Sequence, residues 1–120
     1  MTRARIDLGR RSEVAAEEHL ERQGYAVRAR NFRCRVGEID LVVERGNTLV
    51  FVEVRCRSDD RFGTAAESVV ERKRRRLCIA AEAYLQRLRA DPPVVRFDVI
   101  AVEWRDGKPR IDHIESAFDC

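Results

Sequence analysis

Residues 38–55 limit the fold more than any other segment, because two alternating apolar stretches flank a Gly46-Asn47 turn. A Gly-Asn pair between such stretches is typical of a two-residue β-hairpin loop. This loop predicts an apolar face made of three cross-strand pairs, Ile39–Val54, Leu41–Val52 and Val43–Val50. A slip of one residue would scatter these side chains over both faces, so the hydrophobic pattern predicts the register as well as the strands.

The other face of the predicted hairpin brings two acidic residues together. The same register sets Asp40 directly opposite Glu53, with Val42 and Phe51 as the next pair on that face. Directly paired residues have Cβ atoms about 5 Å apart, so two carboxylates in these positions repel each other. The apolar neighbours indicate partial burial, which raises the free energy of the charged pair further.

Such a pair needs a cation or a shared proton, and two interpretations stay open. A divalent ion fits the first, because Mg²⁺ usually takes one or two carboxylates together with water and phosphate oxygens. In the second, nearby arginines neutralise Asp40 and Glu53, or both side chains lie in solvent at a sheet edge. The spacing does not single out a third acid. Glu13 and Glu17 share one face of a predicted helix, and helix glutamates are usually solvated.

The rest of the chain predicts helices and strands around this hairpin, without repeats or an interdomain linker. The expected elements are a helix at 10–23, strands at 25–32, 38–44 and 48–55, a helix at 70–89, strands at 94–104 and 110–114, and a C-terminal helical turn. The second helix is expected to bury a stripe made of Leu77, Ala81, Tyr84 and Leu88. The order αβββαββ within one domain, residues 1–120, predicts an α/β fold with helices packed on a mixed sheet.

The charge composition indicates an arginine-rich surface. The chain has 24 Lys and Arg against 21 Asp and Glu, and only Lys73 and Lys108 are lysines. Arginine suits phosphate recognition better than lysine does, although a G+C-rich genome explains the same bias. The uncharged apolar stretches are only strand-sized, and no apolar run follows the charged N-terminus. We therefore expect a cytoplasmic protein with no membrane partner and no secretory signal.

Several reactive side chains are predicted to have structural roles or none. Asp98 lies two residues after Arg96 on one face of a predicted strand, which favours a structural ion pair over a ligand. His19 and His113 are isolated in the sequence, and the pattern assigns neither a role. No C-x-x-C pair or nearby histidine marks a zinc site, so we expect four ordinary thiols. These are Cys34, Cys56, Cys78 and Cys120.

A run of five cations, Arg72 to Arg76, opens the second predicted helix. These charges oppose the helix dipole, and only Glu71 offsets them, so a bound phosphate would relieve the repulsion. A solvated charged face is the alternative. The residues that we expect to contact a nucleic-acid backbone are Arg33, Arg35, Arg57, Arg72, Lys73, Arg75 and Arg76. No base-reading motif is visible, so we expect salt-sensitive recognition of nucleic-acid structure.

Several motifs together carry a resemblance over nearly the whole chain. They are Gly9-Arg-Arg-Ser-Glu13-x-x-Ala16, Leu20, Gly24-Tyr25, Asn31-Phe32-Arg33, Gly37-Glu-Ile-Asp40-Leu, Phe51-Val-Glu-Val-Arg55 and Arg96-Phe-Asp-Val. This set resembles the YraN family of small bacterial proteins. That family is similar to archaeal Holliday-junction resolvases and restriction-endonuclease-like nucleases. The resemblance therefore implies a restriction-endonuclease-like α/β fold.

The same resemblance implies roles for particular residues. Related nucleases carry a helix Glu, an Asp and an E-x-K motif, which match Glu13, Asp40 and Glu53 here. These three acids are the implied ligands of Mg²⁺ or Mn²⁺. Arg55 falls where the related enzymes have lysine. Arginine stays protonated and is no general base, so we expect Arg55 to hold a phosphate and leave the activation of water to the metal.

Three functions follow as hypotheses. The first is a metal-dependent endonuclease on structured or branched DNA, with Glu13, Asp40, Glu53 and Arg55 as catalytic residues. The second is a nucleic-acid-binding protein with a catalytically silent nuclease fold, which the arginine at position 55 favours. The third is an adaptor whose arginine surface meets an acidic protein, and it predicts no salt-sensitive DNA binding. A homodimer is compatible with each.

Overall fold

The computed structural model describes residues 3–57, 71–88, 92 and 94–120. Its elements are α1 (Arg3–Arg22), β1 (Ala26–Cys34), β2 (Gly37–Arg45), β3 (Thr48–Arg57), α2 (Glu71–Arg87), β4 (Val94–Arg105) and β5 (Lys108–Ile114). This is the predicted order αβββαββ, and the mixed α/β architecture is compatible with a restriction-endonuclease-like fold. Neither described helix is long and apolar enough to span a membrane.

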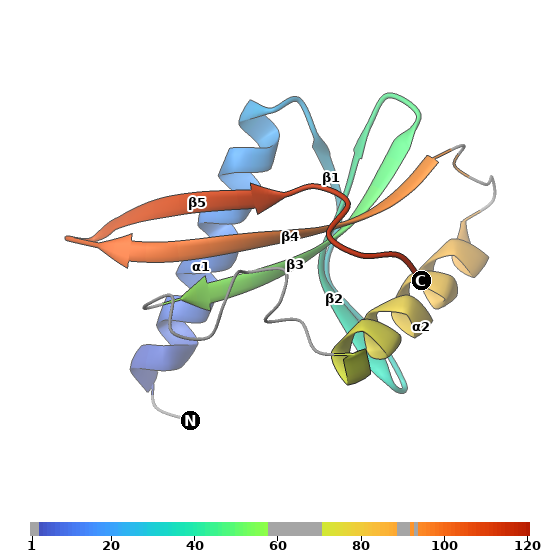
Figure 1. Ribbon diagram of the computed structural model, residues 1–120, viewed down its shortest axis with the longest axis horizontal. Coiled ribbons are helices and arrows are strands. Elements are labelled where there is room, and N and C mark those ends of the chain that lie inside the picture. Colours follow the sequence, from blue (N-terminus) through green and yellow to red (C-terminus); the bar gives the residue numbers. More distant parts are fainter. Residues whose placement is uncertain (1–2, 58–70, 89–91, 93) are drawn as a thin grey trace.

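A five-stranded sheet with the order β1-β2-β3-β4-β5 forms the middle layer. β3 and β4 are parallel, and the other neighbouring strands are antiparallel. Parallel neighbours need a crossover connection, and the chain between β3 and β4 contains α2. The two helices lie on opposite faces of the sheet (Figure 1).

Each face of the sheet buries its own apolar cluster. On the α1 side, Ala15, Ala16 and Leu20 pack against the sheet residues Leu41, Val43, Val50, Val52, Ile100 and Val102. On the α2 side, Leu77, Ala80 and Ala81 pack against Ile39, Val42, Leu49, Phe51, Val99 and Ala101. Because both faces are covered, the central strands read as nearly continuous apolar runs. The predicted buried stripe of the second helix is confirmed at Leu77 and Ala81.

The predicted hairpin register is confirmed where β2 and β3 pair. Leu41 lies opposite Val52, and the pairing reaches the turn at Arg45 and Thr48. The turn requires a positive φ of 60° at Gly46, which glycine adopts without a steric penalty. The prediction is wrong beyond Leu41: the expected Asp40–Glu53 and Ile39–Val54 pairs are not part of the ladder. Ile39 packs on the α2 side instead of sharing the α1 side with Leu41.

Several element ends also differ from the predictions. α1 begins at residue 3, whereas the prediction began the helix at residue 10. The hydrophobic pattern missed these first turns because they are largely charged and exposed and have no apolar periodicity. β1 and β2 extend beyond the predicted strand ends at 32 and 38 and leave a two-residue connection at 35–36. A turn at 115–116 replaces the predicted C-terminal helical turn. The predicted helix ends at 70 and 89 lie outside the described residues.

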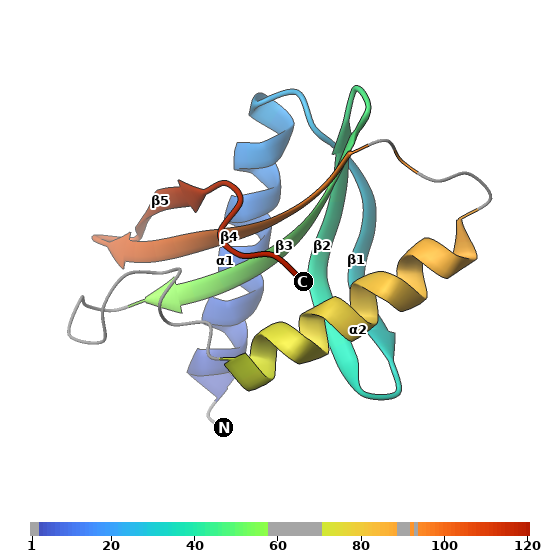
Figure 2. The same ribbon diagram turned by 45° about the vertical axis from the view of Figure 1, so that its right-hand side comes forward.

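The cysteines differ from the prediction of four free thiols. Cys78 on α2 and Cys120 form a disulfide, while Cys34 and Cys56 are free. The bonded cysteines are 42 residues apart in the sequence, with Cα atoms 5.6 Å apart in space. No local spacing predicts this pair, because only the packing of the final residues against α2 brings the two cysteines together (Figure 2).

Candidate active site

The two strands of the hairpin separate at one point, which we call the fork. Their ladder ends at the Leu41–Val52 pair. Just beyond it, the backbone N–H of Val54 donates a hydrogen bond to Asp40 Oδ2 at 2.8 Å. A side chain thus takes the place of the next backbone acceptor, and β2 and β3 diverge from there (Figure 2).

The neighbouring strand β1 is irregular at the same level. Arg30 pairs with Leu41 and Phe32 pairs with Ile39, which leaves Asn31 beside Asp40 without a regular pair. Asn31 has a φ of 50°, a left-handed conformation that asparagine adopts more readily than most residues. The change of side at Ile39 belongs to the same distortion. The strand pairing is therefore interrupted on both sides of Asp40.

Asp40 and Glu53, which we call the acid pair, meet at the fork. The residue Glu53 is only 5% exposed, and its carboxyl group acts directly on that of Asp40. Burial, followed by the charge of Glu53, raises the pKa of Asp40 to about 8, although the Val54 N–H opposes this shift. An acid with this pKa keeps its proton at neutral pH unless a cation replaces it.

Glu13 approaches the acid pair from α1. Burial raises the pKa of Glu13, a hydrogen bond to the Asn31 side chain lowers it, and the charges of Glu38 and Glu53 raise it. Across the described residues, no three His, Cys, Asp or Glu side chains gather closely enough to hold a metal ion by themselves. The protein donors at the fork are therefore the two carboxylates of the acid pair, and Glu13 as a ligand stays a prediction.

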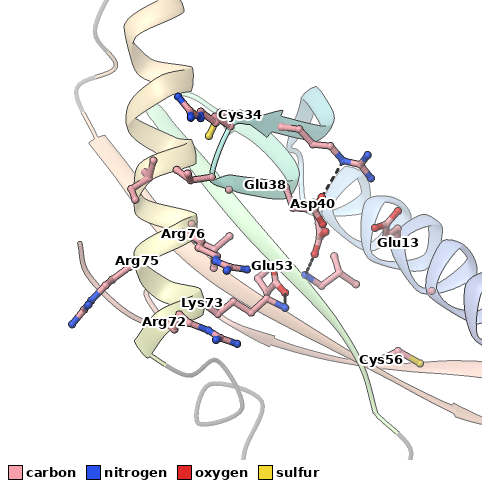
Figure 3. A pocket seen from close by; sticks show the side chains of 18 of the residues that line it. Glu13, Cys34, Glu38, Asp40, Glu53, Cys56, Arg72, Lys73, Arg75 and Arg76 are labelled. Atoms are coloured by element: carbon pink, nitrogen blue, oxygen red, sulfur yellow. Dashed lines mark hydrogen bonds and ion pairs between the residues drawn. The ribbon is translucent and has the colours of Figure 1, made fainter. Parts of the chain in front are cut away.

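Two cationic side chains lie near Glu53. Lys73 Nζ is 2.5 Å from Glu53 Oε1, whereas Arg55 Nη1 is 3.9 Å from the same oxygen. Lys73 reaches the acid pair from α2, as Figure 3 shows. The lysine that the E-x-K comparison expects on β3 is thus absent from that strand, and an amine from another element lies at Glu53.

A cleft of about 1050 Å³ opens at the fork. Its walls come from α1, the β1–β2 turn and α2, and they include the acid pair and Glu13 (Figure 3). Six of the seven cations predicted to bind nucleic acid line it, and we call them the basic wall. They are Arg33, Arg35, Arg72, Lys73, Arg75 and Arg76. The side chain of Arg57 lies outside the described part of the structure.

Comparison with known proteins identifies the family. The sequence model of the "Uncharacterised protein family UPF0102" matches residues 12–102. The chain belongs to the UPF0102 family. This confirms the predicted YraN relationship, because UPF0102 and YraN denote the same family.

The UPF0102 relatives match nearly the full chain. A UPF0102 protein from Ectopseudomonas mendocina is 50% identical over 115 residues, covering 95% of this chain and 96% of the relative. One from Pelotomaculum thermopropionicum is 47% identical over 120 residues, covering 98% and 100%. One from Pseudomonas aeruginosa is 48% identical over 117 residues, covering 95% and 94%.

A second buried acid of this UPF0102 chain, Asp98, has very different surroundings. Arg96 Nε and Nη2 donate to its two oxygens at 2.9 Å, and Ser116 N donates at 3.0 Å. His113 Nε2 lies 2.7 Å away. These hydrogen bonds lower the pKa of Asp98, although burial alone would raise it. The predicted structural ion pair with Arg96 is therefore confirmed.

Sequence reasoning missed several partners in these two regions. His113 and His19, which the pattern left without a role, lie 3.3 Å apart at their ring nitrogens, and His113 also contacts Asp98. Glu17, predicted to be solvated, pairs with Arg30. The role of Asn31 beside Glu13 had one signal, because Asn31 lies in a motif of the resemblance. No spacing rule connects this β1 residue to a glutamate on a helix.

Proposed function

We propose that this protein is a metal-dependent endonuclease that hydrolyses phosphodiester bonds in structured or branched DNA. The observation that carries this proposal is the buried acid pair in a cleft with a basic wall. A negatively charged polymer matches the wall, and a divalent cation matches the acid pair. Few other ligands satisfy both parts of one cleft, because a purely anionic ligand would be repelled by Asp40 and Glu53.

The donor set at the fork fits Mg²⁺ or Mn²⁺. Both donors are carboxylate oxygens, and burial, followed by the negative charge of Glu53, raises the pKa of Asp40. Two protein carboxylates are sufficient for Mg²⁺, which keeps water and phosphate oxygens as its other ligands. When bound, such an ion activates water and neutralises charge on the phosphate.

The side chains of this cleft have different proposed roles in the reaction. Asp40 and Glu53 hold the cation, and Glu13 orients water from α1. The basic wall holds the phosphates on either side of the bond to be broken. In the reaction, the oxygen of water bonds to phosphorus while one ester P–O bond breaks. The proton released by water balances the departing oxygen, so the products are a phosphate monoester and a hydroxyl group.

Structure in the nucleic acid, more than its sequence, is the expected determinant of recognition. The basic wall comes from three separate segments, the end of β1, the β1–β2 turn and the first turns of α2. Contacts of this kind neutralise phosphates and carry no base information. Binding should therefore weaken steeply with salt and vary little with sequence.

The test compares cleavage of a four-way junction, a flap and a linear duplex of the same sequences, each with Mg²⁺ or Mn²⁺. Asp40→Asn keeps the shape of the side chain and removes the charge. Glu44→Gln is the matched control, because Glu44 lies on the same strand and pairs with Arg28 outside the cleft. We expect metal-dependent cleavage by the wild type and Glu44→Gln only. Equal activity in Asp40→Asn would overturn the proposal.

A second candidate, a DNA-binding protein without catalysis, is favoured by Arg55 in place of the E-x-K lysine. It predicts binding of the same DNA by fluorescence anisotropy, steep salt dependence, and no product with either metal. It also predicts that Asp40→Asn binds DNA as tightly as the wild type at neutral pH without metal, because Asp40 keeps its proton there and the basic wall is unchanged. Metal-dependent cleavage that Asp40→Asn abolishes would exclude this candidate.

A further inference from the structure

The cations beside Glu53 differ in their relation to the cleft. Lys73 lines the cleft, and its ammonium group lies 2.5 Å from Glu53 Oε1. Arg55 is not among the lining residues, and its guanidinium lies 3.9 Å from that oxygen. The contact of Lys73 is a short charge-assisted hydrogen bond, whereas the contact of Arg55 is beyond hydrogen-bonding distance. The Arg55 side chain thus contributes little to the orientation of the Glu53 carboxylate.

The helical phase of α2 explains why Lys73 points inward. Lys73 is one turn before Leu77, which is 3% exposed, and the same stripe continues at Ala80. The neighbouring Arg72 and Arg75 fall off this stripe and are exposed. In Figure 3, Arg75 extends away from the acid pair, while Lys73 extends toward it. The lysine of this basic run therefore belongs to the sheet-facing side of the helix.

Close packing of α2 on β2 sets the distance between this helix and the fork. A Cβ added at Gly37 would lie 2.2 Å from the backbone oxygen of Arg76, so only glycine permits this approach. Gly37 opens β2, three residues before Asp40. The first turns of α2 are thus held directly against the strand that carries one acid of the pair. Lys73 therefore approaches Glu53 from a helix whose packing on β2 sets its distance from the fork.

We propose that Lys73, and not Arg55, is the cationic side chain that positions Glu53 in the active site. A compact ammonium on a flexible stem fits a single buried carboxylate oxygen better than a planar guanidinium does. It holds Glu53 oriented toward Asp40, and with 40% of its side chain exposed it also faces the cleft. The catalytic consequence of this role rests on the proposed endonuclease function, whereas the positioning itself does not.

A double-mutant cycle tests the positioning without metal or activity. The melting temperature is measured in chelator for Lys73→Met, Glu53→Gln and the double variant, and again with Arg55→Met in place of Lys73→Met. We expect Lys73→Met to lower the melting temperature by about 4 °C in the wild type and by less than half of that beside Glu53→Gln. Arg55→Met should have the same effect in both backgrounds. A background-independent effect of Lys73→Met would overturn the proposal.

Steady-state cleavage then separates positioning from general folding and from DNA affinity. A misplaced catalytic group lowers kcat by about 100-fold, so Lys73→Met should show this loss. KM should change little, because the arginines of the basic wall remain to bind the DNA. Lys73→Arg should recover part of it, and Arg55→Met should lose less than Lys73→Met does. Arg87→Met, which removes a cation from the last turn of α2 outside the cleft, should leave kcat unchanged.

The two proposals fail in different ways. Absence of wild-type cleavage with either metal overturns the endonuclease function, and the thermal cycle still decides whether Lys73 positions Glu53. If the wild type cleaves and Arg55→Met loses as much kcat as Lys73→Met, the assignment of Lys73 is wrong while the endonuclease function stands.

Discussion

Asp40 and Asp98 both lie on interior strands of one sheet, where burial raises the pKa of each, yet their neighbouring groups have opposite electrostatic effects. Asp98 accepts hydrogen bonds from Arg96 and Ser116 and lies 2.7 Å from His113 Nε2, and its pKa is lowered. Asp40 accepts one backbone hydrogen bond and faces Glu53, and its pKa is raised to about 8. Burial is common to both, so the partners decide the direction of the shift.

This difference separates a structural acid from a candidate functional one. The chain provides the charge balance of Asp98 from its own residues, as a stable folded state requires. At Asp40 it provides a second acid instead, and it interrupts the strand pairing on both sides to do so. Such an arrangement lowers stability unless an external cation binds, which is the expected signature of a binding site.

The largest expected effect is on catalysis at Asp40. Asp40→Asn should reduce the rate of metal-dependent DNA cleavage by about 10³-fold or more, because one of the two charged donors for the cation is lost. Its melting temperature in chelator should be equal to or above that of the wild type, since a repulsive pair is removed. A fall in both activity and stability would show that Asp40 is structural, as Asp98 is.

The corresponding change at Asp98 should act on stability. Asp98→Asn leaves Arg96 beside an uncharged side chain, so we expect a loss of about 3 kcal/mol in the free energy of unfolding, measured by urea denaturation. Asp112→Asn on β5 is the control, because this residue is exposed and should change stability little. If Asp98→Asn is as stable as this control, Asp98 is not a structural acid and its contrast with Asp40 does not hold.

The two acids should also give pH dependences of opposite sign. The folded-state pKa of Asp40 exceeds its unfolded value of 3.8, so its stabilising contribution is complete at low pH and is lost as pH rises toward 8. The pKa of Asp98 is lowered, so its contribution is present above pH 3.8 and is lost as pH falls further. In chelator, Asp40→Asn should gain stability relative to wild type between pH 5 and about 8.5, whereas a constant difference would contradict the shift.

A smaller effect is expected from the hydroxyl group at the edge of the Asp98 network. Arg96 Nη2 donates to Tyr25 Oη at 2.5 Å, and Tyr25 is 4% exposed. Tyr25→Phe should lower the free energy of unfolding by about 1.5 kcal/mol, because a buried hydrogen bond to a charged group is lost. Thermal unfolding measures this loss. An unchanged melting temperature would mean that Asp98 alone holds Arg96.

Much of this arrangement could be predicted from local pattern. The Gly46-Asn47 turn and the apolar alternation predict the hairpin register, and that register predicts the proximity of Asp40 and Glu53. The ion pair of Asp98 with Arg96 also follows, because residues two apart on a strand share a face. These features depend on residues that are close in sequence or linked by one tight turn.

The features that were not predicted depend on long-range packing. The change of side at Ile39 arises where β2 leaves β3 beside a distorted β1, and no alternation rule encodes that break. Lys73 reaches Glu53 only because α2 crosses the sheet at this height. The Cys78–Cys120 disulfide likewise requires the chain end to lie on α2. Sequence spacing carries no information on such contacts until the fold is known.

Titration with Mn²⁺ tests the central claim most directly, because it asks whether the acid pair binds a cation. Metal binding is followed by calorimetry and by the melting temperature, in wild type, Asp40→Asn and the control Glu44→Gln. We predict that Mn²⁺ binds and stabilises the wild type and the control, and that Asp40→Asn loses both effects. Equal binding and equal stabilisation of all three proteins would place the cation elsewhere and contradict the account.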